Sequence, residues 1–79
     1  MKKTELNKLL ENVLPKDWEI ETVRKKSFTI RYPLAYKFKV TYETVRRHIC
    51  KIQKASGAKE TGGGCLIGSP WYNVNFAWD

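Results

Sequence analysis

The sequence predicts a small single α+β domain over residues 1–79, in which two helices pack on an antiparallel sheet. The expected element order is α-β-β-β-α, with a possible additional strand at the C-terminus. Two segments repeat apolar residues at helical spacing, the segments between them alternate apolar and polar residues, and a last alternating segment follows a glycine-rich stretch. Of the 79 residues, 42% are hydrophobic and 29% are charged, which is the composition of a folded domain.

The first helix is expected over residues 4–14. Thr4 is suited to cap its N-terminus, and Pro15 is expected to end it. Its apolar residues follow the i, i+3, i+4, i+7 spacing of a stripe that faces a core. They are Leu6, Leu9, Leu10, Val13 and Leu14.

Three antiparallel strands are expected next, over residues 18–24, 28–32 and 36–40. Each alternates apolar with polar residues, so one face of each strand should be buried. Pro33 interrupts the path between the second and third strands, because proline cannot donate a hydrogen bond to a sheet. The rings expected to point inward include Phe28, Tyr36 and Phe38.

The second helix is expected over residues 42–56, with Thr41 as its N-cap and Gly57 after its C-terminus. Residues 56–70 are rich in glycine and are interpreted as a flexible connector. A phosphate-binding loop is disfavoured there, because no lysine followed by serine or threonine comes after the glycines.

The segment 71–78 alternates again and predicts the final strand. One side of that strand would carry Trp71, Asn73 and Asn75. An exposed tryptophan is typical of protein interfaces, so these three residues are candidates for contact with a protein. The alternative is that the segment completes the small core.

The formal net charge of +7 is distributed unevenly along the chain. Eleven of the fifteen basic residues lie between Arg24 and Lys59, where Glu43 is the only acid. Such a concentration of positive charge indicates an acidic partner, most simply nucleic acid.

Two groups of basic residues are the candidate phosphate contacts. On the second helix, Arg47, Lys51 and Lys54 share a stripe and Arg46 lies on its flank; solvated helix faces of this kind also occur without a ligand. The second group is the turn after the first strand, with Arg24, Lys25 and Lys26.

The outer face of the sheet is a weaker candidate. Glu19 and Glu21 should project from the same side as its basic residues and neutralise part of their charge. Those basic residues are Arg31, Lys37 and Lys39. Of the aromatic residues, Tyr32 and Tyr42 are the best placed for stacking on bases.

No catalytic residue, metal site or cofactor is predicted. His48 and Cys50 are two residues apart on a helix and do not face each other, and Cys65 completes no ligand motif with them. His48 has no evident partner to orient it as a general base, so a surface or interface histidine is expected. The two cysteines are expected to be free thiols, with one disulfide as the alternative.

The first 57 residues resemble, in element order, double-stranded RNA-binding domains and mRNA-interferase toxins of the HicA type. The resemblance depends on the segment 5–10 in the first helix, the three strands, and the segment 44–49 in the second helix. In those toxins a catalytic histidine follows a Gly-Ser pair at the second strand, whereas residues 25–28 here are Lys-Lys-Ser-Phe. The resemblance therefore concerns architecture and does not imply ribonuclease activity.

The sequence thus predicts a non-catalytic, regulatory nucleic-acid-binding protein that contacts the phosphate backbone through a basic helix. The alternative is a small inhibitor or adaptor, of the kind phages and mobile elements carry, that docks on an acidic protein or nucleoprotein. An RNA-cleaving toxin is a third hypothesis. No apolar run approaches the roughly 20 residues that span a membrane, and no apolar stretch follows the N-terminal lysines. We therefore expect a cytoplasmic protein without a membrane partner, and a homodimer is possible because pairing enlarges a small core.

Overall fold

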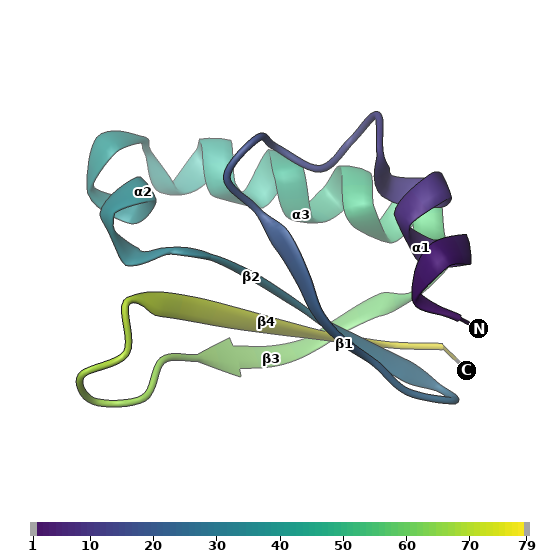
Figure 1. The fold of residues 1–79 in the computed structure, drawn as a ribbon. Coiled ribbons are helices and arrows are strands. Elements are labelled where there is room, and N and C mark those ends of the chain that lie inside the picture. Colours follow the sequence, from purple (N-terminus) through teal and green to yellow (C-terminus); the bar gives the residue numbers. More distant parts are fainter. Residues whose placement is uncertain (1, 79) are drawn as a thin grey trace.

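The computed structural model describes residues 2–78, without the side chains of Lys37 and Phe38. Four strands form one antiparallel sheet in the order β1-β2-β4-β3 (Figure 1). Strands β1 and β2 form one hairpin, β3 and β4 form another, and β2 pairs with β4 at the centre. The strands are β1 (Glu19–Val23), β2 (Ser27–Pro33), β3 (Lys59–Gly64) and β4 (Trp71–Ala77).

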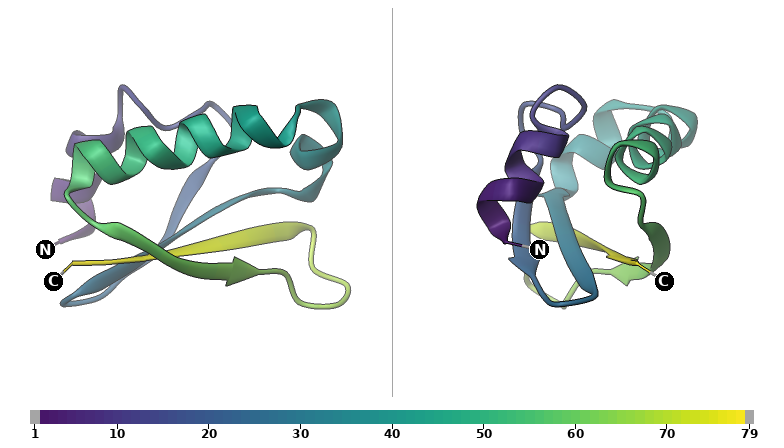
Figure 2. Two further views of the ribbon diagram at one scale, coloured as in Figure 1. Left: turned by 180° about the vertical axis from the view of Figure 1, so that it is seen from behind. Right: turned by 90° about the vertical axis from the view of Figure 1, so that its right-hand side faces the viewer.

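In the described part of the chain, three helices lie on the same side of this sheet. They are α1 (Lys3–Leu10), α2 (Leu34–Lys39) and α3 (Tyr42–Ser56). Figure 2 shows that the helices form one layer and the twisted sheet a second layer. Within residues 2–78 no helix covers the opposite side of the sheet, and we call that side the open face.

The core lies between the two layers, as the period-two alternation of the strands requires. The rings of Phe28 in β2 and Phe76 in β4 stack with their centroids 4.9 Å apart. Leu6 and Leu10 of α1 are fully buried against this layer. The same core receives one stripe of α3, which consists of Val45, Ile49 and Ile52.

Helix α3 has the bounds and the caps that the sequence predicts. The Thr41 hydroxyl accepts a hydrogen bond from the Thr44 amide at 3.3 Å. At the other end, Gly57 adopts the left-handed conformation with φ 76°, and its amide donates to the Gln53 carbonyl at 2.9 Å. Both ends of the helix are therefore fixed by local interactions.

The third strand expected over residues 36–40 is wrong, because most of this segment lies in helix α2. The position beside β2 is taken by β4, which pairs with it from Ser27 to Pro33. Beyond Pro33 the Leu34 amide donates to the Pro70 carbonyl at 2.9 Å, and the chain turns into a helix. Lys39 is consequently not on the sheet, while the side chains of Lys37 and Phe38 lie outside the described part.

Two further boundaries differ from the expectation. The glycine-rich segment is not only a connector, because Lys59–Gly64 pairs with β4 as an edge strand. Helix α1 begins at Lys3, with Lys2 rather than Thr4 at its N-cap. It ends at Leu10, and the amides of Val13 and Leu14 both donate to the Leu10 carbonyl in the turn that follows.

Candidate nucleic-acid interface

The outer side of α3 carries the basic stripe that the sequence predicts. Arg47, Lys51 and Lys54 are exposed, on the side away from the buried stripe of the helix. Among the described residues, none of these three side chains has an ion-pair partner. They line a shallow hollow of about 500 Å³ together with Tyr42, Glu43, Arg46 and Cys50.

Arg46 differs from the rest of the stripe. Its guanidinium donates a hydrogen bond to Glu60 of β3 at 2.7 Å, and this contact joins the helix to the edge of the sheet. The hydrogen bond to the Glu60 carboxylate raises the pKa of Arg46 above its ordinary value. Because Glu60 lies just beyond the basic segment, the charge count could not reveal this pairing.

The turn residues Arg24, Lys25 and Lys26 lie elsewhere. They connect β1 to β2, and all three are exposed. Arg24 lines a hollow on the open face, whereas the α3 stripe belongs to the helix layer. The structure therefore divides the seven predicted phosphate contacts into two separate groups.

The open face carries the predicted pair of Arg31 with Glu19 and the predicted protein-contact residues of β4. Arg31 of β2 bonds Glu19 of β1 at 2.7 Å, as the expected cross-strand pairing requires. The Arg31 guanidinium also lies 4.3 Å from the centroid of the Trp71 ring, so Trp71 is half-buried rather than exposed. Asn73 and Asn75 follow Trp71 on the same side of β4.

Of the two tyrosines considered for base stacking, only Tyr42 is accessible, with 73% of its surface exposed. Tyr32 is 1% exposed, and its ring stacks on Trp18 at 4.4 Å, so the expectation of a role in stacking on bases is wrong. Tyr32 is in register with Tyr72 and points to the helix side of the sheet.

His48 is half-buried inside an aromatic cluster, whereas the sequence predicts a surface or interface histidine. Its Nε2 atom forms a 2.9 Å hydrogen bond with the Tyr36 hydroxyl, and its ring lies 5.4 Å from Trp18. Burial, and secondarily the charge of Lys51, lower the pKa of His48. Helical spacing indicates this burial, because His48 follows Val45 by three residues and so falls within the apolar stripe of α3.

Cys50 and Cys65 are both free and exposed. Within residues 2–78, no three histidine, cysteine or acidic side chains come close enough together to hold a metal ion. None of the helices in that part of the chain combines the length and apolar character needed to cross a membrane.

Comparisons with protein-family models, with curated proteins and with solved structures found no match.

Proposed function

We propose that this chain is a non-catalytic nucleic-acid-binding protein that contacts the phosphate backbone through the outer side of α3. The observation that carries the proposal is the exposed stripe of Arg47, Lys51 and Lys54, which forms no ion pair with an acid among the described residues. Free cationic side chains on a polyanion release its counterions, and this release supplies most of non-specific binding.

The geometry of α3 suits this task. Arg47 and Lys54 are seven positions apart, which corresponds to about 10 Å along a helix. This length matches about three base pairs, at 3.4 Å of rise each. Because both ends of α3 are capped, the stripe is held on a rigid element and loses little backbone entropy on binding.

The proposal assigns no catalytic residue and no cofactor. The only described histidine, His48, is held by Tyr36, and its Nδ1 atom is closed off from solvent. Two exposed free thiols are typical of a reducing compartment, so we place this activity in the cytoplasm.

The test is a titration of a labelled duplex with a charge-reversed protein, Arg47→Glu with Lys51→Glu. The matched control is Lys8→Glu with Lys16→Glu, which changes the net charge equally at exposed positions outside α3. We expect the α3 variant to lose most of its affinity and the control to lose little. Equal losses in the two variants would show that only overall charge matters and would overturn the proposed site.

A protein partner is the second candidate, and one observation favours it. Leu66 and Ile67 lie in the connection between β3 and β4, and both are largely exposed. Adjacent exposed apolar side chains are typical of interface anchors. This alternative predicts a complex that survives nuclease treatment and is lost in a Leu66→Ser, Ile67→Ser variant; a complex unaffected by those substitutions would contradict it.

A further inference from the structure

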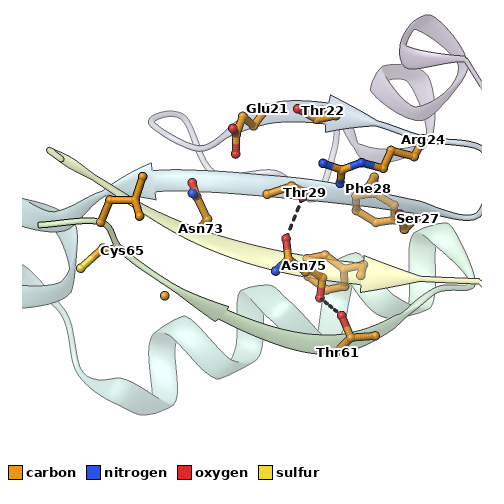
Figure 3. Close-up of a pocket in the computed structure, with 13 residues that line it drawn as sticks. Glu21, Thr22, Arg24, Ser27, Phe28, Thr29, Thr61, Cys65, Asn73 and Asn75 are labelled. Atoms are coloured by element: carbon orange, nitrogen blue, oxygen red, sulfur yellow. Dashed lines mark hydrogen bonds between the residues drawn. The ribbon is translucent and has the colours of Figure 1, made fainter.

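The open face is hollowed between its four strands. The depression has a volume of about 630 Å³, within the size range of small-molecule and cofactor sites. Figure 3 shows side chains from all four strands around it. We call it the open-face depression, and its polar lining includes Glu21, Thr22, Thr29, Thr61, Asn73 and Asn75.

The β3 side of the depression is left uncovered by a glycine. Gly64 pairs in register with Asn73 and has no side chain to cover the central strands. Cys65 and Leu66 stand at the end of β3 and line the depression there. A flat group can therefore reach the side chains of β4 from this side.

The two asparagines on the floor differ in their hydrogen bonding. Thr29 is 5% exposed, and its hydroxyl donates to Asn75 Oδ1 at 2.7 Å (Figure 3). This bond occupies the amide oxygen of Asn75 and leaves its NH₂ group as a donor. Two residues before it on β4, the Oδ1 atom of Asn73 is buried and has no hydrogen-bond partner among the described residues. The terminal torsion of asparagine has a broad energy well, so the amide of Asn73 can turn toward the depression.

With the Asn73 amide turned toward the depression, the NH₂ group of Asn75 and the Oδ1 atom of Asn73 place a donor and an acceptor beside each other on β4. Nucleobases carry donors and acceptors side by side on their edges, and asparagine amides pair with such edges. Glu21 adds a carboxylate that can accept from an exocyclic amine, as acidic side chains do with cytosine.

Two basic residues lie at one end of the open face. Arg24 lines the depression, and its amide bonds the Ser27 carbonyl at 2.7 Å. Ser27 is in register with Ala77, and Ala77 with Lys59 on the opposite edge of the sheet. Arg24 and Lys59 therefore mark both sides of that end, where phosphates on either side of a bound base could be neutralised.

The other end of the face carries the stack of Arg31 on Trp71. Arginine planes and aromatic rings are the surfaces on which unstacked bases lie in single-strand complexes. Phosphate-neutralising, base-pairing and stacking groups thus follow one another across the open face.

We propose that the open-face depression binds one base of a single-stranded nucleic acid. The inference takes nucleic acid as the partner from the proposed function, but it uses the side of the sheet that α3 does not occupy. Asn73 and Asn75 contact the base, while Arg24 and Lys59 contact the flanking phosphates.

The experiment compares two variants against two probes, a labelled eight-nucleotide single strand and a labelled duplex. We expect Asn73→Ala with Asn75→Ala to weaken single-strand binding about tenfold or more and to leave duplex binding unchanged, because each base contact of this kind discriminates by about this factor. The matched control is Asn7→Ala with Asn12→Ala, at two exposed asparagines outside the sheet. Unchanged single-strand affinity in the open-face variant, or an equal loss in the control, would overturn the inference.

The two proposals fail separately. Arg47→Glu with Lys51→Glu should weaken the duplex and spare the single strand, so loss of the α3 effect alone leaves the open-face result standing. A second measurement does not depend on the variants folding. In the unaltered protein, the side-chain amide signals of Asn73 and Asn75 should shift on addition of the single strand in nuclear magnetic resonance spectra. Shifts confined to α3, or equal shifts with a free nucleoside monophosphate, would contradict binding of a strand at this site.

Discussion

Gly63 is the position where the sheet leaves no room for a side chain. A Cβ atom there would lie well inside van der Waals contact with the Asn73 carbonyl oxygen and 3.3 Å from Val74 Cα. Both are backbone atoms of β4, so they cannot rotate away. We expect Gly63→Ala to push β3 away from β4 and to lower the free energy of unfolding by about 2 kcal/mol, as overpacking typically does.

The neighbouring Gly64 provides the matched control. A Cβ built there meets nothing within 4 Å. Gly64→Ala should therefore leave stability unchanged or raise it by up to about 1 kcal/mol, because alanine restricts the unfolded chain. For a domain of this size, the loss in Gly63→Ala corresponds to a fall of about 10 °C in the melting temperature, measured by circular dichroism. Equal melting temperatures for the two variants would refute the close approach of β3 to β4.

Three further predictions concern the helix layer. Burial and the charge of Lys51 lower the pKa of His48 in the folded protein. As the pH falls through the ordinary value of 6.5, the unfolded chain therefore binds a proton before the folded chain does. Stability should therefore fall as the pH drops through 6.5 and stay level above it, and His48→Gln should remove that slope in denaturant titrations at several pH values. Thr41→Ala removes the N-cap of α3 and should cost about 1 kcal/mol in the same titrations, whereas a change below experimental error would argue against the cap. Glu60→Gln removes the acid bound to Arg46 and should strengthen duplex binding a few-fold; weaker binding would show that the pair is needed to hold the helix in place.

The local parts of the fold were predictable from the sequence. Helix α3 was placed correctly because its apolar spacing and both caps act within a few residues of each other. The strands β1, β2 and β4 were placed within one or two residues, because their alternation is long enough to define a buried face.

The sequence-based predictions are wrong where contacts between residues far apart in the sequence determine the secondary structure. Five alternating residues at 36–40 fit a strand as well as a helical turn, and only the pairing of β2 with β4 excludes the strand. The segment 62–64 has no side chains and therefore no period, so its pairing in β3 was invisible. At Gly63, glycine is required by the close approach to the backbone of β4 rather than by a flexible loop.

The candidate site was predictable in part. The exposed stripe on α3 follows from helical spacing alone. The ion pair of Arg46 with Glu60, and the separation of the turn 24–26 from the stripe, depend on how the two layers are assembled. The sequence predicts Asn73 and Asn75 as candidates for contact with a protein, but their place on the floor of a hollow depends on strands from both hairpins.

The most direct test of the central claim is the salt dependence of duplex affinity for the unaltered protein and for Arg47→Glu with Lys51→Glu. Each lost phosphate contact reduces the slope of log affinity against log salt by about 0.9, so we predict a slope about 1.8 smaller in the variant. At 0.1 M salt this corresponds to a loss of about 50-fold in affinity or more. Parallel salt dependences with similar affinities would contradict the assignment of α3 as the phosphate-binding surface.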